Sequence, residues 1–422
     1  EISLGLVGSE MCIRDRSYHK APMKHKWHSG RKMCYTVSII FCEREVLASM
    51  RFTSLRLARF RNYDSLELSP HPGITVLYGP NGSGKTNLLE AMHLLSVGRS
   101  HRTANDREMI AAGANVALVH GQTRRLDGAH EVEVRLYPLE KPKKRVLLYG
   151  KPAQRVADLM GHATTVMFSP EDLRIVRDGP VMRRRFLDMQ LSQIRPSYLR
   201  ALKTYLSVLE RRNALLKQNR VAGVNDFANQ LDTWDEQLAA ACVPIVGARR
   251  WFLEELSRSA AEQYAAIAET PGETFSLSYA GPLSRTDTPY RDMLAGLHRT
   301  RAEDIQRLFT SFGPHRDDMS LTLCGRELRA FGSQGQMRTA VLSMKLGEIR
   351  LIENEMGEPP TLLLDDVFSE LDVRRRSALL KSTEGVQTLI TCTDRQDAAD
   401  AHADAFLRVS QGEDGKACLS PA

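Results

Sequence analysis

The sequence predicts an α/β fold in which a core of strands and helices carries an antiparallel β lobe and an inserted helical lobe. Three observations predict it. The apolar strand 74–78 runs into a glycine-rich loop, and residues 87–97 continue with apolar side chains at helical spacing. Apolar and polar side chains alternate between 116 and 148, as in an antiparallel sheet with one solvated face. Between 180 and 268 the spacing becomes that of long amphipathic helices.

The composition is close to the average for globular proteins. Of 422 residues, 42% are hydrophobic and 26% are charged. No run approaches the ~18 consecutive apolar residues that a membrane-spanning helix requires. The net charge of +7 suits contact with phosphates without requiring it. The seven cysteines form no CxxC pairs, which argues against a disulfide framework or a metal site and favours a reducing compartment. We therefore expect a cytoplasmic protein.

Residues 1–49 differ from the rest of the chain. They show neither helical nor strand periodicity, and the stretch Ser3–Arg16 resembles a translated sequencing adaptor. The apolar run Val37–Cys42 is shorter than the ~7 residues of a signal-peptide core. Met50, in contrast, starts a clean amphipathic strand. We therefore expect a non-native or disordered leader at 1–49 and a natural protein that begins at Met50.

The strand 74–78 follows two strand-like stretches, at 52–60 and 66–68, and leads into a complete phosphate-binding loop. The loop matches GxxxxGK[ST] in the strand–loop–helix setting that such a loop requires. Its glycines let backbone N–H groups face phosphates, and the following helix adds its positive end. We expect Lys85 to reach the β and γ phosphates and Thr86 to bind Mg²⁺. The alternative is a glycine-rich turn that matches by chance. The candidate nucleotide-binding residues are Gly79, Pro80, Asn81, Gly82, Ser83, Gly84, Lys85 and Thr86.

A second nucleotide element lies far along the chain, where the apolar strand 360–364 ends in Asp365 and Asp366. A buried strand can end in two carboxylates only if something pairs with them, and a cluster of Mg²⁺ and phosphate does so. We expect Asp365 to join the Mg²⁺ shell and Asp366 to act in catalysis with Lys85, by polarising or orienting the attacking water. The alternative is a solvated Asp–Asp turn, which the phosphate loop on the same chain disfavours.

Two short segments near the acidic pair indicate the class of ATPase. Ser369–Asp372 resembles the D-loop of ABC-type ATPases, and Ser333, Gly335 and Gln336 resemble the core of their signature motif. The resemblance implies an ABC-type ATPase head in which the signature residues meet the γ phosphate held by a second copy. ATP with Mg²⁺ would then hold a homodimer together. For the Gly-Ser-Gln-Gly sequence alone, an ordinary loop is the alternative.

The region between the two nucleotide elements indicates an inserted helical lobe. Apolar stripes mark helices at 198–209 and 227–238, prolines such as Pro244 punctuate them, and no heptad repeat is long enough for an extended coiled coil. After 274 strands and helices alternate again. We expect the first part of the ATPase head, with the phosphate loop and the β lobe, at 50–180, the helical lobe at 181–270 and the second part of the head at 271–422.

Four further segments resemble the RecF family, and the resemblance covers almost everything from Met50 to Val409. It adds Arg61 and Asn62 to the candidate nucleotide-binding residues. It implies a repair and replication protein that dimerises on ATP and binds duplex, gapped or single-stranded DNA. It also implies the mediator proteins RecR and RecO as partners in loading a recombinase at single-strand gaps. The four segments are Arg59–Tyr63, Phe168–Leu173, Arg183–Asp188 and Gly313–Asp318.

Two departures from the broader ABC pattern concern hydrolysis. No obvious Gln-loop glutamine precedes the helical lobe, and Thr391-Cys392-Thr393 stands where a switch histidine is expected. We therefore expect slow hydrolysis, with a turnover below ~10 s⁻¹, an ordinary enzyme rate. The family resemblance implies a weak ATPase that DNA stimulates.

The sequence indicates DNA-binding residues less specifically than it indicates the nucleotide-binding residues. Arg99, His101, Arg102 and the run 141–145 are candidate phosphate ligands, although solvated basic loops have the same composition. His315 and Arg316 lie in a turn that either contacts a ligand or only satisfies its own charges.

Three other functions were weighed. The ATPase subunit of a membrane transporter uses the same dimer, but compact transport cassettes have no large lobe between the equivalents of Lys85 and Asp365. An SMC-like tether needs long coiled coils, which this sequence does not contain. A RecA-type helicase motor does not explain the segment 333–336.

Overall fold

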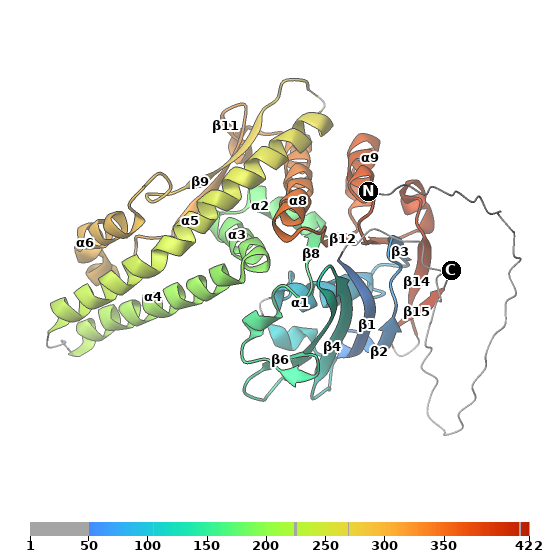
Figure 1. Ribbon diagram of the computed structural model, residues 1–422, viewed down its shortest axis with the longest axis horizontal. Helices are drawn as coiled ribbons and strands as arrows, with labels where there is room; N and C mark the ends of the chain where they lie inside the picture. Colours follow the sequence, from blue (N-terminus) through green and yellow to red (C-terminus); the bar gives the residue numbers. More distant parts are fainter. Residues whose placement is uncertain (1–49, 104, 223–225, 269, 413–414, 422) are drawn as a thin grey trace, which may run out of the picture. The chain divides into compact units, whose positions relative to one another are not determined.

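A computed structural model describes residues 50–422, apart from 104, 223–225, 269, 413–414 and 422 (Figure 1). The leader expected at 1–49 lies outside the described residues. Three sheets and the helices packed on them build the described chain, which confirms the predicted α/β class.

The central sheet has six strands, and all except the edge strand β15 run parallel. Parallel strands have their carboxyl ends at one edge, which is where ligands bind in such sheets. The end of β3 and the end of β12 therefore lie at the same edge. In spatial order the strands are β15 (Ala417–Pro421), β14 (Ala405–Gln411), β3 (Ile74–Tyr78), β13 (Thr388–Cys392), β12 (Thr361–Asp365) and β8 (Thr165–Phe168).

A second six-stranded sheet is antiparallel throughout, as the alternation between 116 and 148 predicts. Helix α1 (Lys85–Val97) packs between this sheet and the central one, because Leu88 and Leu95 share a buried cluster with Val119 of one sheet and Leu363 of the other. Helix α1 is buried along most of its length, and its polar residues Glu90, His93 and Ser96 are buried together with the apolar ones. The strands are β2 (Tyr63–Leu68), β1 (Arg51–Phe60), β4 (Ala117–Arg125), β5 (Gly128–Leu136), β6 (Lys144–Leu148) and β7 (Lys151–Pro152).

Long helices follow in the middle of the chain. Helices α4 (Pro196–Ala222) and α5 (Phe227–Ile267) lie side by side (Figure 1). Pro244 lies inside α5, so the proline that was expected to punctuate the helices does not end this one. Residues after 270 join the same packing: α6 and the small sheet β11–β10–β9 contact α5. The domain boundaries at 180 and 270 stay predictions.

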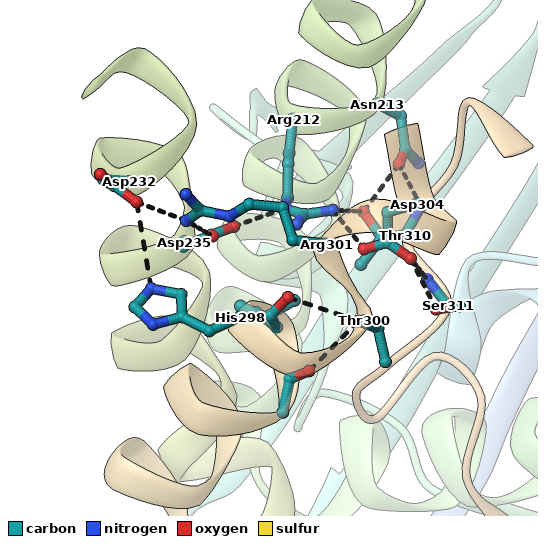
Figure 2. A network of polar contacts seen from close by, with 12 residues as sticks. Arg212, Asn213, Asp232, Asp235, His298, Thr300, Arg301, Asp304, Thr310 and Ser311 are labelled. Atoms are coloured by element: carbon teal, nitrogen blue, oxygen red, sulfur yellow. Dashed lines mark hydrogen bonds and ion pairs between the residues drawn. The ribbon is translucent and has the colours of Figure 1, made fainter. Parts of the chain in front are cut away.

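A buried ionic network joins α4, α5 and α6 (Figure 2). The Arg212 side chain is fully buried; its Nε donates to Asp235 Oδ1 at 2.6 Å and its Nη1 to Asp304 Oδ2 at 2.8 Å. Arg301 of α6 donates to the other Asp235 oxygen at 2.6 Å. A buried charge is tolerated only when it is paired, so this network fixes how the three helices pack.

The remaining elements connect these layers. Helix α8 packs on the face of the central sheet opposite α1. None of the described helices is both long enough and apolar enough to cross a bilayer. The other helices and strands are η1 (Asp106–Met109), η2 (Val156–Leu159), η3 (Pro170–Leu173), α2 (Arg174–Arg177), α3 (Pro180–Ile194), β9 (Phe275–Ala280), α6 (Pro289–Arg307), β10 (Asp318–Leu323), β11 (Arg326–Glu327), α7 (Leu328–Phe331), α8 (Gln334–Met356), η4 (Phe368–Glu370), α9 (Val373–Lys381) and η5 (Arg395–Ala401).

Candidate nucleotide-binding site

The loop 79–84 connects β3 to α1 and wraps tightly because its backbone takes conformations that only glycine adopts easily. Gly79 has φ 153°, and a Cβ there would lie 2.0 Å from the carbonyl oxygen of Val409. Gly84 has φ 118°, and a Cβ there would press on the Asn62 side chain. Larger residues at these positions would therefore deform the loop. The loop ends where α1 begins, so backbone N–H groups and the positive end of the helix meet there.

Lys85 is the first residue of α1 and is buried. Its Nζ donates to the carbonyl oxygens of Gly79 at 2.6 Å and Pro80 at 3.0 Å. Burial lowers the pKa of Lys85, and the nearby charge of Asp366 opposes that shift. Ser83 Oγ is buried and has no hydrogen-bond partner among the described residues. A cation bound only to carbonyls and an unpartnered hydroxyl fit an anionic phosphate group.

The two residues predicted to bind Mg²⁺ are in contact. Thr86 Oγ1, at the start of α1, donates to Asp365 Oδ1 at 2.8 Å, and Thr391 Oγ1, on β13, donates to the same oxygen at 2.8 Å. This contact joins the phosphate loop to the end of β12. Hydroxyl and carboxylate oxygens are the hard ligands that Mg²⁺ prefers, so the residues present fit this ion.

Asp366 follows directly and has φ 51°, in the left-handed region that residues with a side chain rarely adopt. Its backbone N–H donates to Thr391 Oγ1 at 2.9 Å, which fixes this conformation beside Asp365. Burial, and then the charge of Asp365, raises the pKa of Asp366. Strained residues and shifted carboxyl groups both concentrate at functional sites.

The two residues added by the family resemblance behave differently. Asn62 Nδ2 donates to the Ser83 carbonyl oxygen at 3.2 Å, so Asn62 contacts the loop. Arg61 instead donates to both carboxylate oxygens of Glu90 on α1, at 2.8 and 2.7 Å. Its third side-chain bond, to the Glu108 carbonyl oxygen, also leads away from the loop. Arg61 therefore braces α1, whereas Asn62 lies at the loop itself.

The signature-like residues lie at the exposed start of α8. Ser333 Oγ accepts from the Gln336 backbone N–H at 3.1 Å, and the Gln336 side chain accepts from the Ser333 N–H at 2.8 Å, forming a reciprocal cap. Gln336 Nε2 donates to Glu273, and the Gly335 carbonyl oxygen accepts from Arg375. Within the described part of the chain, no hydrogen bond joins these residues to 79–86. One copy thus holds the phosphate loop and the signature-like cap as separate surfaces.

The candidate DNA contacts are only partly available. Arg99 and Arg102 are both exposed, but the Arg102 guanidinium already donates to Asn87 at 2.9 Å. In the run 141–145, Lys144 bonds Asp106 and Arg145 bonds Glu140.

The turn at 315 and 316 serves packing. His315 Nδ1 lies 2.6 Å from the Tyr205 hydroxyl, its Nε2 lies 2.9 Å from the Thr310 carbonyl oxygen, and burial lowers its pKa to about 4. Arg316 stacks over Phe309. These contacts agree with the charge-satisfied turn weighed from the sequence.

Several contacts of the site have no signal in the sequence. Thr391 was noted only as a departure from the switch histidine, yet its hydroxyl holds both acidic residues. Gln411, on the neighbouring strand β14, donates from its Nε2 to the Gly82 carbonyl oxygen at 3.0 Å. Glu90 is buried and pairs with Arg61. Threonine in a strand and glutamine near a terminus are common, so only the fold reveals them.

Known proteins resemble the chain over almost all of its described length. The family model of the RecF/RecN/SMC N terminal domain matches residues 51–417. The DNA replication and repair protein RecF of Symbiobacterium thermophilum is 41% identical over 355 residues, which cover 82% of this chain and 92% of that protein. The RecF of Staphylococcus aureus is 37% identical over 372 residues, covering 86% of this chain and 99% of that protein.

Solved structures give the same result. A structure of the recombination mediator protein RecF with ATP in the RecFOR pathway superposes with a TM-score of 0.82 at 32% identity, covering 90% of this chain and 100% of that one. The Smc head domain of Pyrococcus furiosus, at 17% identity, has a TM-score of 0.53 over 88% of this chain and 96% of that one. The second similarity shows the shared ATPase-head fold.

Proposed function

Since the chain belongs to the RecF family of the RecF/RecN/SMC N-terminal domain proteins, we propose that it is an ATP-dependent DNA-binding protein of replication and repair. In this proposal it dimerises on ATP, binds duplex or gapped DNA and helps load a recombinase at single-strand gaps. The observation that carries the proposal is the 2.8 Å contact between Thr86 and Asp365, which joins the phosphate loop to the acidic strand.

Each site residue takes one role. Lys85 would leave the carbonyls of its own loop and bind the β and γ phosphates, while loop N–H groups bind the remaining oxygens. Thr86 and Asp365 would hold Mg²⁺, which supplies charge neutralisation when bound. Asp366 would orient and polarise the attacking water, because its raised pKa favours accepting a proton.

The dimer follows from the separation of the two surfaces. Ser333 and Gly335 lie at the exposed start of α8, where a helix N-terminus attracts an anion. In a head-to-tail pair they would cap the γ phosphate held by the other copy. The Gln336 side chain accepts from the Ser333 N–H and donates to Glu273. We therefore assign Gln336 the role of positioning Ser333.

Slow hydrolysis is part of the proposal. Thr391 stands at the end of β13, where a switch histidine is expected, and its hydroxyl already bonds Asp365 and the Asp366 backbone. Its single O–H is already donated to Asp365, so it cannot also donate to a γ phosphate while it keeps this bond. We therefore expect a weak ATPase with turnover below ~10 s⁻¹, and we expect DNA to stimulate it because the family consists of DNA replication and repair proteins.

The partners rest on the family. Two related structures are described as parts of the RecFOR pathway, which supports RecR and RecO as mediator partners here. The transporter ATPase weighed from the sequence finds no support, because the matching relatives are DNA replication and repair proteins.

Sedimentation velocity of the full chain tests the proposal. With ATP and Mg²⁺ the monomer should become a dimer, and added duplex DNA should sediment with it. Ser333→Arg should bind ATP normally and stay monomeric, because the larger side chain blocks the cap. Lys85→Ala should lose ATP binding and dimerisation together. A wild-type chain that stays monomeric with saturating nucleotide, or a dimer that ignores DNA, would contradict the proposal.

A further inference from the structure

Two side chains of the antiparallel sheet and its turns, and a third from the segment before β8, bring their polar atoms together. His130 lies on β5, Tyr149 in the turn between β6 and β7, and His162 between η2 and β8. The Nδ1 atoms of the two histidines are 2.9 Å apart, and the Tyr149 hydroxyl oxygen lies 2.8 Å from His130 Nδ1. The His130 and His162 ring centroids are 5.1 Å apart. The nucleotide-binding proposal uses none of these residues.

Hydrogen bonds alone cannot satisfy this group. His130 Nε2 lies 2.8 Å from Asp127 Oδ1, and an ionised carboxylate only accepts, so this nitrogen carries a hydrogen. In a neutral ring, His130 Nδ1 then has a single lone pair for both His162 and Tyr149. In a protonated ring it has a single N–H for both. In either state one of the two short contacts lacks a full hydrogen bond, whereas a cation accepts electron pairs from all of these atoms at once.

We propose that His130 and His162 bind a divalent transition-metal ion of the zinc type through their Nδ1 nitrogens, with the Tyr149 hydroxyl oxygen as a third ligand. Imidazole suits zinc and its neighbours in the first transition row. The contact from Asp127 to the opposite nitrogen of His130 is the carboxylate–histidine pattern that orients metal-binding imidazoles.

The surroundings favour this binding. The Tyr149 N–H donates to the Glu131 carbonyl oxygen at 3.1 Å, and Thr123 Oγ1 donates to the His162 carbonyl oxygen at 2.7 Å. The backbone therefore holds the ligands in place. Tyr149 is 51% exposed, so an ion can enter from solvent.

A second group offers a control. Asp232, Asp235 and His298 also bring ligand atoms together, but the Arg301 guanidinium already bonds both carboxylates (Figure 2). Because this positive side chain already neutralises the carboxylates, little negative charge remains to attract a metal ion. We therefore expect no metal binding there, and His298→Gln is a matched histidine substitution outside the proposed site.

The test measures Zn²⁺ binding to the full chain by calorimetry without nucleotide, followed by Co²⁺ absorption to report the ligand set. His162→Gln should remove one Zn²⁺ equivalent, and Asp127→Asn should weaken that equivalent by about tenfold, the usual effect of losing an orienting carboxylate. His298→Gln should bind like wild type. Because binding to the folded state alone raises stability, Zn²⁺ should raise the thermal midpoint of wild type and not of His162→Gln.

Each result decides the proposal. A Zn²⁺ equivalent that survives His162→Gln, or one that His298→Gln removes, would overturn it, as would a wild-type chain that binds no Zn²⁺. If His162→Gln does not fold, Asp127→Asn carries the test, since an exposed carboxylate can be replaced without loss of packing. An unchanged affinity in Asp127→Asn would then count against the site. ATP-driven dimerisation is measured separately, so failure here leaves the proposed function untouched.

Discussion

At the scale of single residues, Asp366 combines two unusual properties. Its backbone is in the left-handed region, and burial together with Asp365 raises its pKa. Both properties cost free energy in a resting protein. Thr391 fixes the conformation through one hydroxyl, which also binds Asp365. This arrangement keeps the Asp366 carboxyl group in one conformation beside the end of the phosphate loop.

Asp366→Asn should therefore separate binding from hydrolysis. The amide keeps the size of the side chain but cannot accept a proton, so ATP affinity should stay unchanged while hydrolysis slows by about 100-fold or more, as for loss of a general base. Single-turnover hydrolysis and sedimentation with ATP measure the two effects, and the dimer should persist longer. Asp64→Asn, at an exposed site on β2, is the control. Unchanged hydrolysis in Asp366→Asn would remove this role from Asp366.

Glu348 gives a prediction about pH. Its side chain is fully buried on α8, where Oε2 lies 3.4 Å from Lys345 Nζ. Burial raises the pKa of Glu348 to about 7. The folded chain thus binds a proton that the unfolded chain releases near pH 4.5, so this group's contribution to stability falls as pH rises from about 4.5 to 7. Glu348→Gln should raise the thermal midpoint by a few degrees at pH 8 and change it little at pH 5.

Lys345 keeps a partner in that variant, because Asp172 lies 3.5 Å away. Thermal unfolding of both proteins at the two pH values measures the difference. An equal shift at pH 5 and pH 8 would show that packing, not the proton, explains the effect.

The residues of the site were predictable to different degrees. The loop 79–86 and the pair Asp365 and Asp366 follow from local sequence, because strand, loop and helix lie next to one another along the chain. Thr391 and Gln411 reach the site from other strands of the sheet, so no local pattern marks them.

At the scale of elements, the apolar stripes of α4 and α5 predicted the two helices. They did not predict the contacts that hold these helices together. Arg212, Asp235 and Asp304 are separated by long stretches of chain and read as ordinary charged residues on helices. Only packing shows that all three are fully buried. For Pro244 the local sequence predicted a break in the helix. Tertiary contacts on both sides of this proline instead keep α5 helical.

Removing the Arg212 guanidinium, the central charge of the buried ionic network, should lower the free energy of unfolding. Arg212→Ala leaves Asp235 and Asp304 buried, so we expect a loss of about 3–5 kcal/mol in the free energy of unfolding, as for other broken buried pairs. Urea unfolding measures it. Arg258→Ala on α5 removes an exposed pair with Glu255 and should cost at most about 1 kcal/mol. Similar losses in both variants would show that the network does not hold the helices.

At the scale of the whole molecule, the fold places the phosphate loop and the acidic pair at the ends of β3 and β12, and the signature-like residues at the start of α8. The sequence marked both groups as candidate binding residues, and it predicted the antiparallel sheet between 116 and 148. It did not predict the histidine pair, because His130 and His162 have no zinc-like spacing and meet only when β5 and the segment before β8 pack together. Long-range pairing of this kind is invisible to local motifs.

DNA binding by this molecule should be electrostatic. Arg99, which follows the end of α1, is exposed in the single chain. Because contacts with phosphates release counterions, the logarithm of the affinity for duplex DNA should fall linearly with the logarithm of the salt concentration. Fluorescence anisotropy with ATP and a labelled duplex, from 50 to 200 mM salt, gives the slope. Arg99→Ala should reduce the slope by about one if it contacts a phosphate, whereas Arg258→Ala should not change it. A slope near zero would mean that the chain binds DNA without phosphate contacts, which would contradict this prediction.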